Sequence, residues 1–267
     1  MQEITTDRVV IVGAGMGALY AALKLAPRPV VMISPETLGE GASSAWAQGG
    51  VAAAMNPADS PKSHSSDTMR AGAGTVDPQV AAQVTREAHE HILNLTDLGT
   101  PFDRDDKGGY VLSREAAHSF ARVVRVKGDQ AGAEIMKALI AQALRTPSIQ
   151  VLEGVMASGL EVENGTVTGV RIETSSENRS QPIVLRGAAY LMAGGGSGGL
   201  YKLTTNPARI RGQVIGMAAR VGAVIADAEF VQFHPTAIDM GEDPAPLATE
   251  ALRGEGATLI NSDGERF

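Results

Sequence analysis

The stretch RVVIVGAGMGALYAALKL, which runs from Arg8 to Leu25, decides the fold. Its first five residues are a β-branched run that predicts a buried strand, and its alanine- and leucine-rich remainder predicts a helix. Between them, Gly13, Gly15 and Ala18 form a G-x-G-x-x-A fingerprint. The first glycine allows a tight turn and the second lets the backbone approach a pyrophosphate. Strand, glycine turn and helix in this order favour a dinucleotide site over a purely structural turn.

A second apolar run, VVMIS at residues 30–34, follows within the spacing of a βαβ unit, which predicts parallel pairing of the two strands. Ser34 and Pro35 stand where NAD-binding units place a ribose-binding acid, and Glu36 comes slightly late. The unit taken alone therefore does not favour NAD.

The segments farther along the chain predict a mixed α/β protein. Apolar residues recur at helical spacing over 79–98 and again over 135–144. Residues 151–172 alternate around Asn164-Gly165, a two-residue hairpin signal, and predict a small antiparallel sheet. The region 38–74 is rich in Gly, Ala and Ser and predicts irregular backbone.

A further apolar strand is expected over residues 188–193, where it runs directly into a glycine-rich turn at 194–199. The expected fold class is α/β, with a doubly wound, Rossmann-like, mainly parallel sheet and a small antiparallel sheet beside it.

Composition excludes several classes of function. The chain has 267 residues, a net charge of −7 and a sequence pI near 5.3, which argue against nucleic-acid binding. It has no cysteine, so it cannot form disulfides, thiolate metal sites or its own iron–sulfur cluster. No metal site is expected, and redox chemistry requires an organic cofactor. No secretory signal or membrane span is evident, which predicts a cytoplasmic protein without a membrane partner.

The segment SSAWAQGGV at residues 43–51 resembles the flavin-contacting loop of the succinate dehydrogenase and fumarate reductase flavoprotein superfamily. Adjacent glycines suit this role because bare backbone can approach a flat ring, although an ordinary flexible loop is the alternative. The resemblance implies FAD, held noncovalently because Ser43 takes the place of the histidine that several members link to flavin. The FAD-binding residues that it implies are Gly13, Gly15, Ala18, Ser34, Ser43, Ser44, Ala47, Gln48, Gly49, Gly50, Ala193, Gly194, Gly195 and Asn206.

Within that superfamily, LSREAAHS at residues 112–119 is similar to the segment in which the L-aspartate oxidases carry a glutamate. Glu115 takes that position, and the resemblance implies that it binds the substrate ammonium and takes part in catalysis. A carboxylate there suits a charge that succinate and fumarate lack. A solvated surface acid is the alternative. His118 is open between a functional histidine and a hydrogen-bonded structural one.

Two further segments resemble the substrate site of the family. EFVQFHPT at residues 229–236 suggests a strand that presents His234 to a cavity, where its imidazole binds a substrate carboxylate. TEALRGEG at residues 249–256 implies that Thr249 donates to a carboxylate and that Glu250 and Arg253 belong to a proton-delivery chain. A helix N-terminus with salt-bridged charges is the alternative.

The resemblance implies an FAD-binding domain over residues 1–237, without its last strand, and the start of a capping domain over 238–267. The chain stops where that domain is only beginning, so a fragment with weak FAD affinity and no activity of its own is expected. A naturally short flavin-binding protein is the competing explanation. Departures are Gln213, where relatives usually have aspartate, and the stretch 120–127.

The implied function is oxidation of L-aspartate to iminoaspartate with oxygen or fumarate as electron acceptor, the first step of de novo NAD biosynthesis. The expected partners are a dicarboxylate or amino-dicarboxylate substrate and a quinolinate synthase that receives the product. The alternatives are a fumarate reductase or succinate dehydrogenase type of flavoprotein and a non-catalytic flavin-binding module.

Overall fold

A computed structural model describes residues 2–174, 181–232, 234–249, 251–254 and 256–266. The chain divides into two compact units. The first comprises Met1–Trp46 and Met136–Pro246, and the second comprises Ala47–Ile135 and Leu247–Phe267. These bounds differ from the predicted boundary at residues 237/238, and the assignment of FAD-binding and capping domains stays a prediction.

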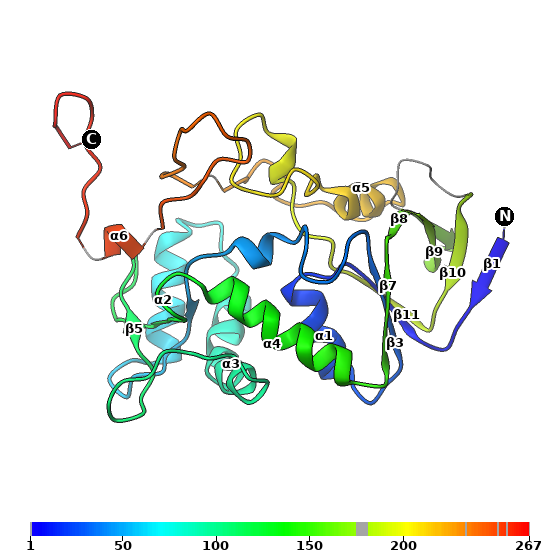
Figure 1. Cartoon of the computed structure of the whole chain (residues 1–267), viewed down its shortest axis with the longest axis horizontal. Coiled ribbons are helices and arrows are strands. Elements are labelled where there is room, and N and C mark those ends of the chain that lie inside the picture. Colours follow the sequence, from blue (N-terminus) through cyan, green and yellow to red (C-terminus); the bar gives the residue numbers. More distant parts are fainter. Residues whose placement is uncertain (1, 175–180, 233, 250, 255, 267) are drawn as a thin grey trace. The chain divides into compact units, whose positions relative to one another are not determined.

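The first unit contains a wholly parallel four-stranded sheet (Figure 1). Its order is β11-β2-β3-β7, formed by β11 (Ala189–Met192), β2 (Val9–Val12), β3 (Val30–Ser34) and β7 (Ile149–Glu153). Helix α1 (Met16–Leu25) connects β2 to β3, and every residue of these two strands is buried. The predicted βαβ unit and the Rossmann-like fold class are confirmed.

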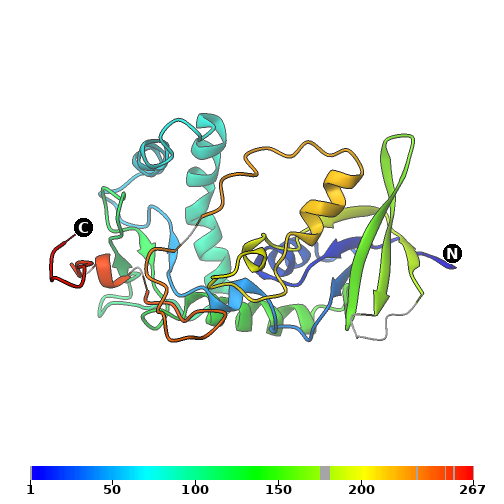
Figure 2. The same ribbon diagram turned by 90° about the horizontal axis from the view of Figure 1, so that it is seen from above.

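A second sheet in the same unit has the order β1-β10-β9-β8. Its strands are β1 (Gln2–Thr5), β10 (Ile183–Arg186), β9 (Thr166–Thr174) and β8 (Val155–Glu163), and Figure 2 shows the long hairpin of β8 and β9. Asn164 and Gly165 form the predicted turn, with φ of 51° and 76°, the left-handed values that a tight hairpin turn requires.

The predicted antiparallel sheet was wrong in two respects: β1 pairs with β10 in parallel, so the sheet is mixed, and the sheet does not begin at Val151. Val151 to Glu153 belong to β7 in the parallel sheet, where Val151 lies opposite Met32. Gly154, at φ 69°, separates β7 from β8 and lets the chain leave one sheet for the other. Strand β1 was not predicted, because Ile4 is its one apolar residue and all four residues are exposed, so only pairing with β10 makes them a strand.

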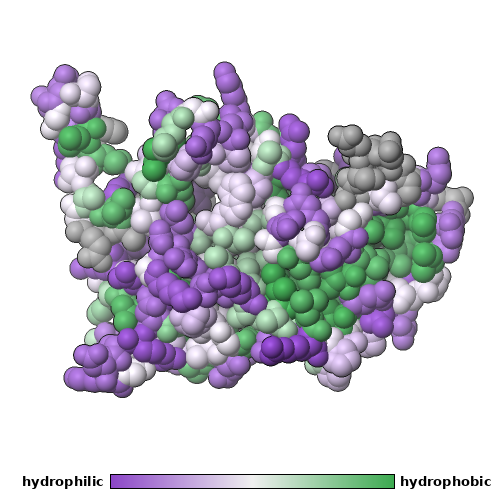
Figure 3. All heavy atoms as spheres, viewed as in Figure 1, coloured by the Kyte–Doolittle hydropathy of each residue, from purple (hydrophilic) through white to green (hydrophobic). Residues whose placement is uncertain are grey.

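The two sheets share one hydrophobic core. Buried side chains from the parallel sheet, such as Val10 and Ile33, pack with Leu160, Val170 and Leu185 of the second sheet. Helix α5 (Gln213–Arg220) adds Met217 to this cluster. On the face drawn in Figure 3, hydrophobic side chains gather over the region of these sheets. The shared core fixes where the parallel strands end, and therefore where their terminal loops lie.

The second unit is built from helices and a small three-stranded sheet. Helix α2 spans Pro61–Ala71 and α3 spans Pro78–Asp97, as the apolar spacing of 79–98 predicts. The sheet has the order β4-β6-β5, from β4 (Val51–Ala52), β6 (Val123–Val124) and β5 (Leu112–Ser113). Helix α6 spans Ala251–Gly254, and helix α4 (Ala131–Arg145), which begins in this unit and has residues 136–145 in the first, confirms the second predicted helix.

The prediction of irregular backbone over residues 38–74 was correct only in part. The chain forms a short 3₁₀ helix, η1, at Ser43–Trp46, and α2 occupies the end of the region. Ser60 caps α2 by accepting from the Ser63 N–H, and Pro61 starts it. This Ser-Pro sequence is a local signal for a helix start. The prediction overlooked it because the region as a whole is rich in Gly, Ala and Ser.

Candidate functional site

The strands of the parallel sheet end at one edge of the first unit, and a cavity lies there. Val12 pairs with Met192 on one side and with Ile33 on the other, so β11, β2 and β3 end in register. Glycines follow two of these strands, and Gly13 and Gly194 both line the cavity. In open parallel sheets, this carboxyl edge is the usual place for a ligand.

Neither glycine could carry a side chain. A methyl group on Gly13, at φ 127°, would lie 2.2 Å from the carbonyl oxygen of Ala193, and one on Gly194 would lie 2.2 Å from a methyl of Val214. At these two positions the cavity wall is therefore bare backbone. Helix α1 starts beside it with no acidic residue in its first turn. Backbone without side chains beside a helix N-terminus suits the pyrophosphate of FAD, so the residues present fit this cofactor.

Other predicted FAD-binding residues in this unit meet through hydrogen bonds. The hydroxyl of Ser44 accepts from the Met16 N–H at 3.1 Å, and the hydroxyl of Ser43 donates to Asn206 Oδ1 at 2.9 Å. Gly15 lies against Ser44, because a methyl on it would be 3.3 Å from Ser44 Oγ. The structure thus brings together segments that are far apart in the sequence.

Three more predicted positions have clear surroundings. The buried Ser34 lines the cavity and directs its hydroxyl to the carbonyl of Glu36. Ala18 is buried in the core. The third fingerprint position is a small residue because helix and strand pack closely there. Gly195 follows Gly194 with φ 81°, a value that favours glycine.

Glu36 is a candidate that the sequence reasoning passed over. It lines the cavity, and its carboxylate forms an ion pair with Arg209, 2.6 Å from Nε to Oε1. A carboxylate here can accept hydrogen bonds from a ribose. The fingerprint of dinucleotide-binding units places the ribose-binding acid at the end of the second strand, which here is β3. In this chain the acid comes two residues after β3, and the turn brings it to the same cavity.

His234 lines a second cavity of the first unit together with Asn206. The predicted cavity is therefore present, but the predicted strand is not: residues 229–232 and 234–236 form loop and turns, and Phe233 lies outside the described residues. The N–H of Thr236 donates to His234 Nδ1 at 3.3 Å. This nitrogen is an acceptor, so the ring proton is on Nε2, which can donate to a carboxylate.

In the second unit, the glycine-pair loop at residues 47–50 lies next to two predicted substrate segments. Gln48 donates from Nε2 to the Leu247 carbonyl at 3.2 Å, two residues before Thr249. A methyl on Gly49 would lie 3.8 Å from Oε1 of Glu115. The loop and the Glu115 carboxylate are therefore neighbours, which sequence spacing could not show.

The backbone of this loop is held by its surroundings. The carbonyl of Ala47 accepts from the Gly132 N–H at 2.9 Å. Gly50 packs so tightly on β6 that a methyl on it would be 2.0 Å from the Val124 carbonyl oxygen. Thr249 and Arg253 are partly buried, Arg253 in α6, whereas Glu250 lies outside the described residues.

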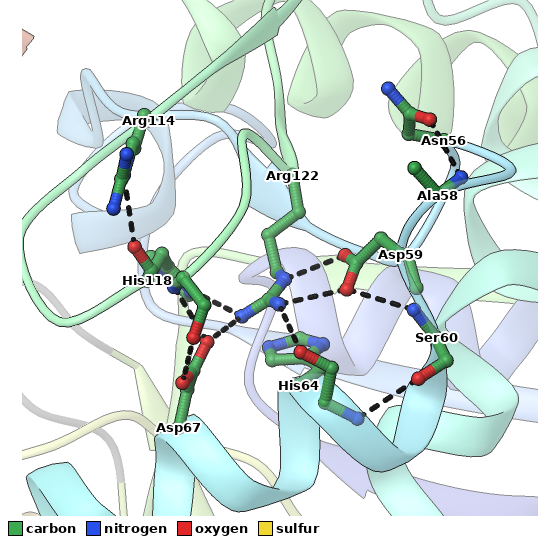
Figure 4. A network of polar contacts seen from close by, with 12 residues as sticks. Asn56, Ala58, Asp59, Ser60, His64, Asp67, Arg114, His118 and Arg122 are labelled. Atoms are coloured by element: carbon green, nitrogen blue, oxygen red, sulfur yellow. Dashed lines mark hydrogen bonds and ion pairs between the residues drawn. The ribbon is translucent and has the colours of Figure 1, made fainter.

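A buried polar network centred on Arg122 joins residues 59–67 to His118 (Figure 4). Arg122 has a fully buried side chain that donates twice to Asp59, at 2.8 and 2.9 Å, and once to Asp67, at 2.6 Å. Its Nη1 also lies 3.0 Å from Nδ1 of His118. Because a guanidinium can only donate, this ring nitrogen accepts and the proton of His118 is on Nε2. His118 is therefore a hydrogen-bonded histidine of this network.

The network shifts the pKa values of its members. Burial alone raises the pKa of Asp67, but hydrogen bonds from Ser119 and Arg122 outweigh it and hold this pKa well below its usual range. Burial, together with the Arg122 charge, lowers the pKa of His118 and of His64. Sequence reasoning missed the network because its members are separated in the chain and make no motif.

Within the part of the chain that the structure describes, no helix is both long and apolar enough to cross a bilayer. The same residues include no cluster of acidic or histidine side chains arranged to bind a metal ion.

Comparison with known proteins agrees with the geometry. Residues 8–267 match the family model described as FAD binding domain. The L-aspartate oxidase of Caulobacter vibrioides is 53% identical over 269 residues, covering 99% of this chain and 52% of that protein. The L-aspartate oxidase of Agrobacterium fabrum is 46% identical, covering 98% and 49% respectively. The chain thus spans about half the length of the curated relatives it matches.

Solved structures show the same fold. E. coli quinol fumarate reductase superposes with a TM-score of 0.92 at 28% identity, covering 99% of this chain and 45% of that one. A flavocytochrome c3 fumarate reductase superposes with a TM-score of 0.81 at 24% identity, covering 98% and 48%.

Proposed function

This chain belongs to the FAD binding domain family, and on that premise we propose that its protein oxidises L-aspartate to iminoaspartate. The observation that carries the proposal is the position of Glu115, whose carboxylate lies beside Gly49 in the loop expected to contact the flavin. Relatives with the name L-aspartate oxidase, 46–53% identical over nearly the whole chain, support it.

Bound FAD would supply the electron acceptor for this oxidation, in which the Cα of aspartate loses a hydride and the amine loses a proton, and oxygen or fumarate would take up the electrons. The chain's own residues bind and orient the substrate. The Glu115 carboxylate holds the ammonium, and this pairing distinguishes aspartate from a plain dicarboxylate. His234 and Thr249 donate to carboxylates, His234 through the Nε2 proton that its Thr236 contact leaves free to donate. Glu250 and Arg253 are proposed to move a proton.

The proposed cofactor mode is noncovalent. Ser43 has a hydroxyl that donates to Asn206, and an alcohol in this position offers no imidazole for a flavin linkage. Denaturation in acid followed by filtration therefore releases yellow FAD into the filtrate. Flavin that remains with the precipitated protein contradicts this assignment.

We also propose that the product passes to a quinolinate synthase in the cytoplasm, as part of NAD biosynthesis. An imine hydrolyses in water, so an enzyme that makes one gains from a partner that consumes it promptly.

A second candidate function is a fumarate reductase or succinate dehydrogenase type of flavoprotein, which the superposition on quinol fumarate reductase favours. The two candidates differ in the charge of their substrates, because aspartate carries an ammonium and succinate does not. A negative side chain is therefore expected beside the substrate only in an aspartate oxidase. Glu115 supplies that charge and favours aspartate. A non-catalytic flavin-binding module is the third possibility.

The deciding experiment uses the complete product of the gene. Its intact mass is recorded, FAD binding is titrated, and peroxide formation is measured with L-aspartate and with succinate. Aspartate-dependent peroxide with little response to succinate supports the proposal. Succinate turnover equal to aspartate turnover favours the reductase type, and flavin binding without any turnover favours the non-catalytic module.

A further inference from the structure

Glu115 lies in a folded-back connection between β5 and β6, residues 114–122. Within it, the His118 N–H donates to the Glu115 carbonyl at 3.3 Å, and Arg114 Nε donates to the His118 carbonyl at 3.1 Å. Ala117 has a φ of 68°, in the left-handed region that costs an alanine conformational energy. Such a turn requires contacts from outside itself to stay in one conformation.

Those contacts come from helix α2 and from the end of the connection. Asp67 on α2 accepts from the Ser119 N–H at 2.7 Å and from the Ser119 hydroxyl at 2.5 Å. The same carboxylate accepts from Arg122 at 2.6 Å, and Arg122 donates in turn to His118. Two consecutive residues of the turn, His118 and Ser119, are therefore fixed by one buried ion pair.

The ion pair itself cannot easily move. The Arg122 side chain has no solvent-accessible surface, and the Asp67 side chain is 3% exposed. Asp59 holds the other edge of the guanidinium with two hydrogen bonds. A buried, bidentate pair with its donors satisfied is a rigid support.

We propose that Asp67 and Arg122 are positioning residues that set aspartate selectivity by holding Glu115 beside Gly49. This inference rests on the proposed function and assigns to it two residues that make no contact with the substrate. A supporting group of this kind affects the substrate through the residue it orients, so its loss weakens ammonium recognition while dicarboxylate recognition stays intact.

The test replaces Asp67 by Asn in the complete gene product. An amide keeps one acceptor oxygen but has no negative charge, so the buried ion pair with Arg122 is lost. Two quantities are measured: the KM for L-aspartate and the inhibition constant of succinate, which has no ammonium. We expect the KM to rise about tenfold or more and the inhibition constant to change less than about twofold, because only the contact to Glu115 is misplaced.

A double-mutant cycle with Glu115→Gln separates positioning from general damage. If Asp67 acts through Glu115, Asp67→Asn changes the KM little once Glu115 is already Gln. Additive effects of the two substitutions, or equal changes in KM and inhibition constant, overturn the inference. Asp77→Ala is the matched control, because it removes the cap of α3 in the same unit without contacting the turn.

Two further measurements keep the outcome decisive. Ser119→Ala removes only the hydroxyl of Ser119 and leaves its N–H to donate to Asp67. It replaces Asp67→Asn if that variant does not fold, and the same selectivity change is expected at smaller size. Amide hydrogen exchange over residues 114–122 is compared in Asp67→Asn and Asp77→Ala. Faster exchange in the first variant alone supports the inference, and equal exchange overturns it. A wild-type enzyme that does not oxidise aspartate contradicts the proposed function, whereas the exchange result still decides the role of Asp67.

Discussion

The Glu115 carboxylate and Gly49 are neighbours in space, with Oε1 3.8 Å from the point where a methyl group on Gly49 would stand. They are 66 positions apart in the sequence. Gly49 belongs to the loop expected at the flavin, and Glu115 belongs to the turn expected at the substrate amine. Their proximity places a negative charge where a substrate ammonium is expected to lie.

Replacing Glu115 by Gln removes that charge and keeps the shape of the side chain. A hydrogen bond to a charged group contributes about 1.5–3 kcal/mol, so kcat/KM for L-aspartate is expected to fall roughly 10- to 150-fold in the complete enzyme. Succinate inhibition stays unchanged, because succinate has no ammonium. Steady-state kinetics check both, with the exposed Glu90→Gln on α3 as control. Parallel losses for both ligands contradict the role of Glu115.

Gly13 and Gly17 give a matched pair in the glycine turn. Gly13→Ala places a methyl 2.2 Å from the Ala193 carbonyl oxygen at φ 127°, whereas Gly17→Ala meets nothing within 4 Å. The first substitution is expected to abolish FAD binding and lower the melting temperature. The second is expected to stabilise α1 by about 0.5–1 kcal/mol, because alanine is the better helix former. Thermal melts and FAD titration check both, and equal effects contradict the close approach of the chain at Gly13.

Arg122→Met leaves the carboxylates of Asp59 and Asp67 buried without their cation. Loss of one partner from a buried ion pair costs about 3–5 kcal/mol of unfolding free energy. Urea denaturation measures the change. Arg186→Met is the control, because Arg186 pairs with Glu3 at the surface and its loss is expected to cost much less. Similar losses in the two variants would show that the buried network adds no special stability.

The pH dependence of stability follows from the lowered pKa values of His64 and His118. In the unfolded chain a histidine takes up a proton near pH 6.5, while in the folded chain it does so only at lower pH. The unfolded state therefore binds more protons, and the free energy of unfolding falls as the pH drops below about 6.5.

His118→Gln tests this prediction while keeping an acceptor for Arg122. Chemical denaturation at several pH values between about 7.5 and 5 should give a shallower loss for the variant than for the wild type. Curves that stay parallel over this range count against a neutral His118 in the folded protein.

Local sequence patterns determined the fold class of this protein. The run from Arg8 to Leu25 specified strand, turn and helix, because β-branched residues, two glycines and an alanine-rich face each favour one backbone conformation. The Asn164-Gly165 turn was determined in the same way. The motif at residues 43–51 and the residues around Glu115 pointed to a flavin and an amino-dicarboxylate.

Tertiary structure alone decided which of these segments meet. Pairing partners assigned Val151 to the parallel sheet, a turn brought Glu36 to the cavity, and His234 lies in a loop where a strand was expected. The network of Arg122 was invisible in the sequence, because its carboxylates belong to a different segment, residues 59–67, and each residue taken singly is an ordinary charge. Burial removes water from these charges, and only the folded chain supplies the partners that replace it.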